Sequence, residues 1–331
     1  MNHLSIDPPQ QPVGTGDAKR RGDQSAPYHA VVAITLTQLT SFLAVVRGGS
    51  ITAAADELVV TQPSVSAALA ALNREVGVAL FVRQGRGVRL SPAGEAFVPY
   101  ATDVLGLLEG GRAAAHEAAA GATRRLRLTA VTTAAESFVP PLMQAFSREY
   151  PGVELVLDVG NRGAVLDAVL SHRADVAIAG KPPTDVRVEA VALTDNEFVL
   201  VTAVDDELAG SELVDAADLG DRTWLLREAG SGTRALNERY LAAAGLTPRT
   251  LTLGSNGAIK QAARAGLGVS LVSRAAVEVE LATGLIASIA LARPPAERRW
   301  WALRSAVGPV RPAVADFMAF AATVGSVPEF D

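Results

Sequence analysis

The chain has 331 residues, and this length predicts two or three domains, each able to bury a core of its own. Hydrophobic residues make up 49% of the sequence and charged residues 20%, so the composition is that of a globular protein. The absence of cysteine excludes disulfides, thiolate metal sites and cysteine nucleophiles, and the net charge of -5 argues against a protein that coats nucleic acid indiscriminately.

Residues 1–33 are predicted to form a disordered tail, because they combine proline, glycine and mixed charges without the apolar run of a secretory signal. No window of about 18 residues is apolar and free of charge, so no membrane-spanning helix and no membrane partner are expected. The histidines are scattered and have no metal-ligand spacing, so neither a metal site nor a cofactor is predicted. These features favour a soluble, cytoplasmic protein.

Residues 34–91 are predicted to form a DNA-binding domain, because three stretches repeat the apolar spacing of a helix with one buried face. Only Val59 to Pro63 separate the second stretch from the third, so two helices meet through a tight turn, as in a helix-turn-helix. Ser50 and Thr61 are the expected N-caps of these two helices. The stripes are Leu39, Phe42, Leu43 and Val46; Ile51, Ala54, Ala55 and Leu58; and Val65, Ala68, Leu69 and Leu72.

The third helix is expected to turn small polar residues outward, which suits entry into the major groove. Its DNA-facing candidates are Gln62, Pro63, Ser64 and Ser66. The segment LFVRQGRGVRLS, residues 80–91, predicts a β-wing whose arginines reach phosphates or the minor groove: Arg83, Arg86 and Arg89. Each feature alone is also compatible with an ordinary helical bundle that carries solvated arginines.

Residues 61–95, TQPSVSAALAALNREVGVALFVRQGRGVRLSPAGE, resemble the signature of LysR-type transcription regulators, in order and without a gap. The resemblance implies a winged helix-turn-helix that binds double-stranded operator DNA and contacts it through Gln62, Pro63, Ser66 and Arg83. It also implies a homodimer or homotetramer, and RNA polymerase as a partner if the protein is an activator. Ala67 departs from the basic or polar residue frequent there, so one base contact is absent.

Residues 92–121 are predicted to form a linker and dimerisation helix that starts at Ser91-Pro92, with a kink at Pro99. Its apolar and small residues recur in steps of four and three: Phe97, Ala101, Val104, Leu108, Gly111, Ala115 and Ala118. Two copies joined along this seam match a two-fold operator. The alternative is a helix that packs on its own domain.

Residues 122–325 are predicted to form an effector-binding domain of two α/β lobes, because short strands alternate with helices. The family resemblance implies a fold like a type 2 periplasmic binding protein. Lobe I is placed at about 122–197 and 304–325, and lobe II at about 198–303. The expected strands are 125–131, 153–158, 175–179, 198–203, 223–226, 250–253 and 268–272, and the expected helices are 137–150, 164–171, 231–244 and 258–264.

The segment REAGSGTR, residues 227–234, predicts an anion site where a strand leads into a helix. Gly230 and Gly232 allow close backbone approach, Ser231 and Thr233 supply hydroxyls, and Arg234 can form a two-pronged hydrogen bond. The alternative is a simple helix cap. Nucleotide-binding loops and a nucleophile elbow are absent from the sequence, so no enzyme activity is predicted.

Three segments resemble the LysR branch that contains regulators of carbon-fixation operons: IAGKPP at 178–183, REAGSGTR, and GSNGAIKQAARAGLGVSLVS at 254–273. The resemblance implies a small anionic metabolite as effector, although Gly257 departs from the acidic residue common there. The cleft candidates are Thr133, Asn161, Ser231, Thr233, Asn256 and Lys260. For Asn161, Asn256 and Lys260 a cap or a solvated side chain is an equal alternative, and Trp300 and Trp301 are expected in the core.

The sequence therefore predicts a DNA-binding transcription regulator that responds to a small anionic metabolite. The alternative function is that of a ligand-binding protein of a transport system, which requires an export signal and no helix-turn-helix. The identity of the effector, the target genes, activation or repression, and dimer or tetramer all stay open.

Overall fold

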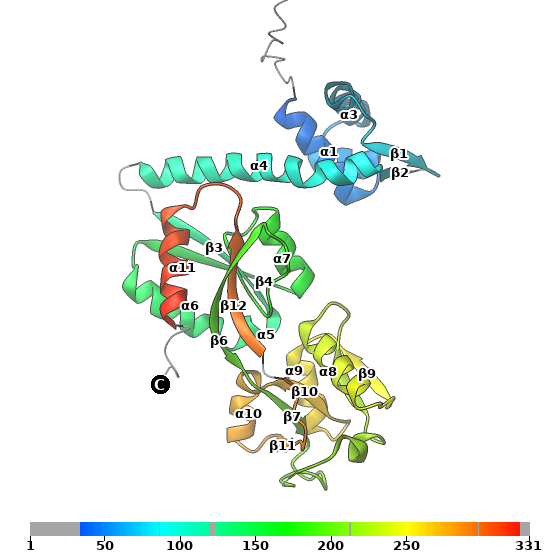
Figure 1. Cartoon of the computed structure of the whole chain (residues 1–331), viewed down its shortest axis with the longest axis vertical. Coiled ribbons are helices and arrows are strands. Elements are labelled where there is room, and N and C mark those ends of the chain that lie inside the picture. The colour runs from blue at the N-terminus through cyan, green and yellow to red at the C-terminus, as the bar shows by residue number, and fades with distance from the viewer. Residues whose placement is uncertain (1–33, 86, 120–122, 212, 297, 325–331) are drawn as a thin grey trace, which may run out of the picture.

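The computed structural model describes residues 34–85, 87–119, 123–211, 213–296 and 298–324. The predicted tail at 1–33 lies outside these residues. Figure 1 shows a small helical domain with a β-hairpin, a long helix α4 that leads away from it, and two α/β lobes below that helix. This order of parts confirms the predicted fold class, an N-terminal winged helix-turn-helix followed by two α/β lobes.

The N-terminal domain is held together by capped helices around an apolar core. Thr35 forms a capping box, and Ser50 and Thr61 accept hydrogen bonds from Ala53 N and Ser64 N, as predicted for these two caps. The largest fully buried side chains of this domain are Phe42, Leu72 and Leu80. The elements are α1 (Leu36–Gly48), α2 (Ile51–Leu58), α3 (Gln62–Val76), β1 (Phe81–Gln84) and β2 (Gly87–Leu90).

Helix α4 (Pro92–Ala118) is a continuous helix of 27 residues capped by Ser91. The helix continues through Pro99 without interruption (Figure 1), and the kink expected there stays a prediction. Only part of the predicted apolar seam of α4 is exposed to solvent. Ala101 is buried in the core of the N-terminal domain and Phe97 packs against the same core, whereas Val104 and Leu108 are exposed.

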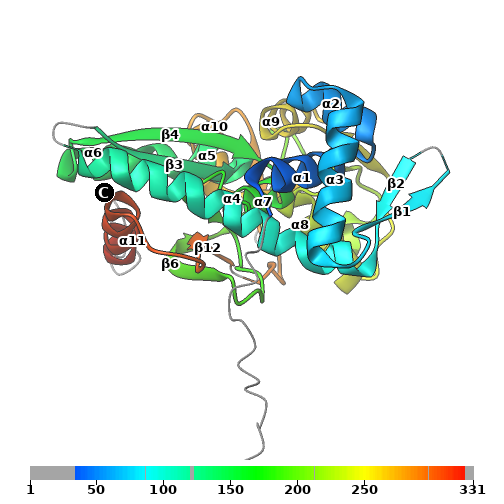
Figure 2. The same ribbon diagram turned by 90° about the horizontal axis from the view of Figure 1, so that it is seen from above.

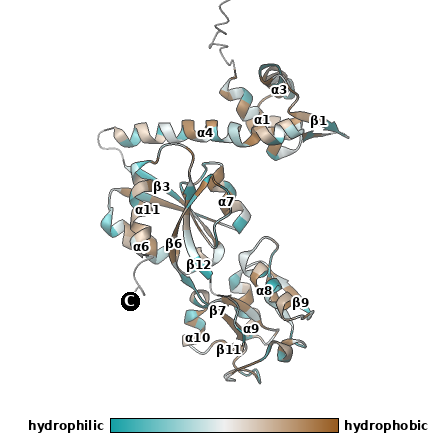
Figure 3. Cartoon of the chain, viewed as in Figure 1, coloured by the Kyte–Doolittle hydropathy of each residue, from teal (hydrophilic) through white to brown (hydrophobic). Residues whose placement is uncertain are grey.

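Lobe I is one five-stranded sheet in the order β4-β3-β5-β12-β6. β3, β4 and β5 are parallel, and β12 runs antiparallel to β5 and β6. Figure 3 shows hydrophobic residues along these central strands and alternating hydrophobic and hydrophilic segments along α4. The elements are β3 (Arg124–Val131), α5 (Thr132–Glu136), α6 (Val139–Glu149), β4 (Val153–Gly160), α7 (Arg162–Leu170), β5 (Val176–Ala179), β6 (Val188–Asn196), β12 (Arg298–Ser305) and α11 (Pro312–Val324).

Lobe II contains an antiparallel sheet in the order β10-β7-β11 and a parallel pair, β8 and β9. A single bridge between Trp224 and Val269 connects the two, and Trp224 is fully buried. The elements are β7 (Phe198–Thr202), η1 (Ala216–Leu219), β8 (Trp224–Arg227), α8 (Gly232–Ala243), β9 (Thr250–Leu253), α9 (Asn256–Arg264), β10 (Ser270–Ser273), η2 (Arg274–Ala276), α10 (Glu278–Ala282) and β11 (Ala287–Ile289).

The two lobes are joined by two chain crossings. The first is Glu197, between β6 of lobe I and β7 of lobe II, and the second precedes β12. Strand β6 and helix α11 were missing from the elements expected from the sequence. Two crossings at one edge leave the opposite faces of the lobes free to form a cleft, which is where the candidate effector site lies.

Candidate functional site

Helix α3 presents its polar face to solvent at the far end of the molecule. Val65, Leu69 and Leu72 face the domain core, whereas the four predicted DNA-facing residues are exposed: Gln62, Pro63, Ser64 and Ser66. Figure 1 shows α3 on the side of its domain away from the lobes, and Figure 2 shows it beside the wing. The exposure of these four side chains is what contact with a DNA duplex requires.

Two side chains at the start of α3 are held in place before any DNA contact. The Gln62 amide donates to the Thr52 hydroxyl over 3.1 Å, which leaves the Gln62 carbonyl oxygen available to a base edge. The Ser64 hydroxyl lies 2.8 Å from the Thr61 hydroxyl. Such preorganisation lowers the entropy cost of forming base contacts.

The wing places its arginines on both faces of the hairpin. Val82 pairs with Arg89 and Arg83 pairs with Val88, so Arg83 and Arg89 point to opposite sides of the ribbon. Both are exposed, and the tight turn between the strands contains Gly85 at φ 58°. The third predicted wing residue, Arg86, lies outside the described residues.

A cleft of about 560 Å³ lies between the lobes, and it contains five of the nine predicted effector residues. These five come from both lobes: Thr133, Asn161, Ser231, Gly232 and Thr233. The Thr133 and Thr233 hydroxyls lie 3.4 Å apart across the lobes, and both residues are buried. Ser231 makes no side-chain cap bond to α8, so its hydroxyl and the first amides of that helix are available to a ligand.

Asn161 combines both roles that the sequence left open. Its side chain accepts a hydrogen bond from Ala164 N over 2.9 Å and so caps α7, and it also lines the cleft. The N-termini of α7 from lobe I and α8 from lobe II therefore both open toward the same space. Two helix N-termini favour a negatively charged ligand.

The cleft is strongly cationic, and this was missed at the sequence level. Among the described residues that line it, six are cations and one is a carboxylate, Glu228; the cations are Arg162, Lys181, Arg227, Arg239, Arg298 and Arg299. Burial lowers the pKa of Arg162, but an arginine stays charged at neutral pH. Lys181 and Arg227 lie inside the motifs IAGKPP and REAGSGTR, so the sequence did contain a sign of two of these six cations.

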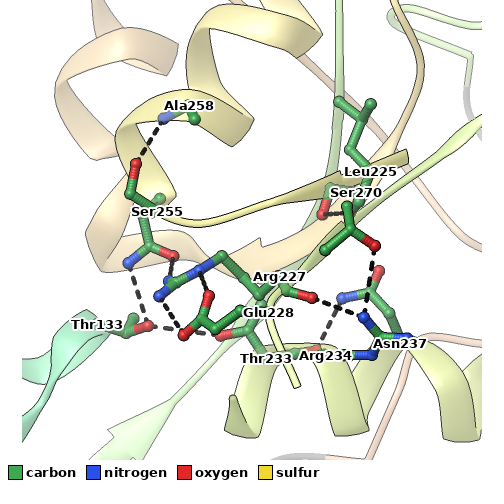
Figure 4. A network of polar contacts seen from close by, with 12 residues as sticks. Thr133, Leu225, Arg227, Glu228, Thr233, Arg234, Asn237, Ser255, Ala258 and Ser270 are labelled. Atoms are coloured by element: carbon green, nitrogen blue, oxygen red, sulfur yellow. Dashed lines mark hydrogen bonds and ion pairs between the residues drawn. The ribbon is translucent and has the colours of Figure 1, made fainter. Parts of the chain in front are cut away.

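Arg227 is the buried centre of a polar network between the lobes (Figure 4). It is 2% exposed, and its guanidinium donates to both oxygens of Glu228, at 2.7 and 3.0 Å. It also donates to the side-chain oxygen Oδ1 of Asn256. Glu228, the single carboxylate among the described residues of the cleft, is thus already paired with Arg227.

Asn256 was predicted as a cleft residue, but it is buried below the cleft and joins the lobes. Its amide nitrogen donates to the Thr133 hydroxyl over 3.2 Å and to the Glu136 carboxylate over 2.6 Å. Asn256 begins α9 in lobe II, whereas Thr133 and Glu136 lie on α5 of lobe I. Both of its N–H donors are used within the protein and its side-chain oxygen accepts from Arg227, so Asn256 serves the contact between the lobes.

Three other predicted effector residues do not line the cleft. Arg234 bonds Glu238 over 2.7 Å, and Lys260 forms an ion pair with Glu280 over 2.7 Å. Gly230 adopts φ 84°, which favours glycine, and a Cβ there would lie 3.5 Å from the Asn161 side chain. Its contribution is the shape of the loop. Helix spacing of four residues pairs Arg234 with Glu238, whereas Lys260 of α9 meets Glu280 of α10 only through the fold.

Two negative findings concern the described residues. No helix among them has the length and apolar character needed to span a membrane. No cluster of three or more His, Asp or Glu side chains in the same part of the chain is suited to hold a metal ion. Trp300 is buried as expected, yet it also borders the cleft together with Trp301.

The sequence matches two family models that divide it in the same order as the structure. Residues 36–95 match the bacterial regulatory helix-turn-helix protein, lysR family, and residues 119–326 match the LysR substrate binding domain. The chain belongs to the LysR family. Within this family it is 35% identical over 288 residues to the RuBisCO operon transcriptional regulator of Allochromatium vinosum, covering 87% of the chain and 95% of that relative. The predicted similarity to regulators of carbon-fixation operons is confirmed.

Solved structures of LysR regulators share the fold. The regulatory domain of Synechocystis PCC6803 CcmR in complex with 2-PG has a TM-score of 0.57 and 31% identity, covering 61% of this chain and 97% of that one. A full-length OxyR variant from Pseudomonas aeruginosa has a TM-score of 0.62 and 25% identity, covering 87% of this chain and 94% of that one. The LysR arrangement of DNA-binding and substrate-binding domains thus extends over the described chain.

Proposed function

We propose that this LysR regulator binds operator DNA through α3 and the wing, as a homodimer or homotetramer, and that a small anionic metabolite in the inter-lobe cleft controls it. The observation that carries the metabolite proposal is the composition of the cleft, six cations and two helix N-termini around one carboxylate that is already paired. The protein acts in the cytoplasm and, if it is an activator, also contacts RNA polymerase.

The proposed parts correspond to a DNA-binding domain at 34–91, a linker helix at 92–121 and an effector-binding domain at 122–325. Gln62 and Ser66 read base edges, and Arg83 binds a phosphate or the minor groove. Their exposure on one end of the molecule supports these roles. Closure of the lobes on the effector changes the placement of the DNA-binding domains through α4.

The effector is expected to bind with its anionic group at the hydroxyls of Thr133, Ser231 and Thr233, where two helices begin. Lys181 and Arg162 neutralise further negative charge. The 2-PG in the regulatory domain of CcmR makes 2-phosphoglycolate a suitable first probe. A phosphorylated sugar or acid has the same chemistry.

DNA binding is tested by gel shift on the protein's own upstream promoter fragment. Gln62→Ala and Ser66→Ala are expected to cost about 1–3 kcal/mol each and to relax base preference, whereas Arg83→Ala weakens binding on all sequences and lowers the salt slope by about 1. Arg148→Ala, on α6 of lobe I, is the control and leaves binding unchanged. An unaltered mobility of the fragment with the wild type would refute the DNA proposal.

Effector binding is tested by a thermal-shift screen of anionic metabolites, beginning with 2-phosphoglycolate. A ligand at 100 times its dissociation constant adds about 2.7 kcal/mol to stability. Lys181→Ala removes a cation that lines the cleft and should abolish most of this gain, whereas Lys260→Ala removes one that does not and should leave it intact. Equal losses in both variants would contradict the cleft as the binding site.

A further inference from the structure

The side-chain amide of Asn256, at the base of the cleft, has an orientation that its neighbours dictate. Its oxygen faces the Arg227 guanidinium, which can only donate hydrogen bonds. Its nitrogen lies 2.6 Å from the Glu136 carboxylate, which can only accept them. The opposite orientation would set a donor against Arg227 and an acceptor against Glu136. Asn256 is 3% exposed, so bulk water does not compete for these bonds.

The fixed amide determines how the Thr133 hydroxyl is used. Of the two hydrogens on the Asn256 nitrogen, one is directed to Glu136 and the other to the Thr133 oxygen, 3.2 Å away. Thr133 therefore accepts from Asn256, and its own hydrogen must point elsewhere. Among the described residues its one further hydrogen-bond partner is the Thr233 hydroxyl, at 3.4 Å. This distance is long for a bond between two hydroxyls, so the Thr133 hydrogen has no strong acceptor within the described chain.

The Thr133 hydrogen is thus available to a ligand in the cleft, which Thr133 and Thr233 both line. The bonds form a hydrogen-bond relay of Arg227, Asn256 and Thr133, and Figure 4 shows the first and last of these side chains. Every donor in the relay points the same way, from the buried cation toward the cleft. Hydrogen bonds in such a chain polarise one another, which strengthens the last donor. The oxygen of an anion is the acceptor that suits this donor best.

We propose that Asn256 is a positioning residue that turns the Thr133 hydroxyl into a donor for the ligand, so that the cleft selects an oxygen acceptor at this point. The inference rests on the proposed binding of an anion in the cleft. It adds a residue that sets specificity from outside, because Asn256 itself does not line the cleft. The alternative is a structural role, in which the amide only connects the lobes.

The test reverses the direction of the relay and keeps its shape. The double variant Asn256→Asp with Glu136→Gln, the exchange variant, swaps an amide and a carboxylate, so the net charge of the pair is unchanged. The new carboxylate still accepts from Arg227, and the new amide at position 136 donates to it, so the lobes stay connected. Thr133 now faces an acceptor, and its hydrogen turns away from the cleft. A structural role of position 256 is retained in this variant.

Calorimetry with 2-phosphoglycolate measures the effect on binding. The exchange variant should bind at least about tenfold more weakly than the wild type, because a hydrogen bond to a charged group is lost. Glu136→Gln alone is the matched control, since the oxygen of its new amide still accepts from Asn256. It should keep the wild-type affinity to within about threefold, because Glu136 is exposed. Equal affinities of the exchange variant and the wild type would overturn the proposal.

The exchange also moves a negative charge toward the cleft, and Thr133→Val separates this effect from the orientation of the hydroxyl. Valine has nearly the shape of threonine but no hydroxyl group. In the Thr133→Val background the exchange should change the affinity by less than about threefold, because its effect passes through that hydroxyl. A full tenfold loss in this background would show that the moved charge weakens binding, and the positioning role would be refuted.

Neutron diffraction on crystals of the deuterated, ligand-free chain gives a readout that needs no ligand. The Thr133 deuterium should point to Thr233 or the cleft in the wild type, and to position 256 in the exchange variant. A wild-type deuterium that points to Asn256 would overturn the relay even if the anion binds. Absence of 2-phosphoglycolate binding to the wild type would count against the proposed effector instead, and the deuterium positions would still decide the orientation of Thr133.

Discussion

Among single residues, Val59 shows clear backbone strain. Val59 ends α2 in the left-handed conformation at φ 55°, and it is 90% exposed, so no packing compensates the cost. A left-handed conformation costs a non-glycine residue about 1–2 kcal/mol, and a glycine at the same position avoids this cost. Part of the benefit is lost, because glycine also gives the unfolded chain more conformational freedom.

Val59→Gly should therefore raise the free energy of unfolding by about 0.5–1 kcal/mol. Urea denaturation followed by circular dichroism measures the change. Gly49→Ala is the mirror control, because Gly49 has φ 66° and no atom within 4 Å of a Cβ, so it should lose a similar amount. A destabilised Val59→Gly variant would contradict the strain argument.

Glu228 is a second residue for which a substitution should improve a measured property, in this case the affinity of the cleft for an anion. It neutralises Arg227 through two hydrogen bonds, and it is the single carboxylate among the described residues that line the cleft. Glu228→Gln should thus free positive charge and tighten the binding of inorganic phosphate or 2-phosphoglycolate by about tenfold, measured by calorimetry. Glu238→Gln, whose carboxylate bonds Arg234 away from the cleft, should have no effect. Weaker binding in Glu228→Gln would mean that Glu228 itself orients the ligand.

Among the elements, the linker helix shows how one pattern can serve two surfaces. The repeating apolar residues of α4 predicted a single dimer seam, but Ala101 and Phe97 pack in the N-terminal core of their own chain. The repeat could not separate these uses, because burial on the same domain and burial on a partner need the same spacing. Val104 and Leu108 stay exposed, together with Tyr100, which is 71% exposed, so this is the face of α4 that we expect a second copy to contact.

The double variant Val104→Asp with Leu108→Asp should weaken self-association by at least about tenfold, because each buried side chain is worth about 1.5–3 kcal/mol. Sedimentation velocity over a concentration series measures this. Val186→Asp is the control, since Val186 is 93% exposed in a loop of lobe I. If both variants associate like the wild type, the dimer does not use this face of α4.

Across the molecule as a whole, the charges at Asp175 connect the linker helix with lobe I, because Arg311 pairs with both Asp175 and Glu117 of α4. Burial tends to raise the pKa of the Asp175 carboxyl, but hydrogen bonds from Arg127 and Arg311 outweigh it, and the pKa is lowered from its ordinary 3.8. A lowered pKa in the folded state means that the ionised carboxylate stabilises the fold above the ordinary pKa. This contribution is lost as the pH falls below that value.

Asp175→Asn should therefore lower the free energy of unfolding by about 3 kcal/mol at neutral pH, because two arginines lose their buried partner. The difference from the wild type should shrink as the pH falls below about 4, where the carboxyl of the unfolded chain is protonated first, and it should vanish only below the lowered pKa of the folded state. Asp167→Asn alters an exposed ion pair and should change stability by less than about 1 kcal/mol at any pH. A difference that stays constant with pH would show that Asp175 acts through packing alone.

Local sequence was sufficient for the parts of this protein that depend on neighbouring residues. The caps at Ser50 and Thr61, the buried stripe of α3 and the hydroxyl-rich start of α8 follow from spacing within one turn or one loop, so they were predictable. The strand β6 was not expected, because its alternating residues form an edge that only pairing with β12 defines.

Which charges meet depends on the folded chain. Arg162, Lys181 and Arg298 converge on one cleft from α7, from the loop after β5 and from β12, whereas Lys260 turns to Glu280. Electrostatic attraction depends on distance in space, and the folding of two lobes sets distances between residues that are more than a hundred positions apart. The order of residues therefore specified the helix-turn-helix and the glycine- and hydroxyl-rich loop before α8, but the fold alone produced the cationic cleft and selected the face of α4 that contacts lobe I.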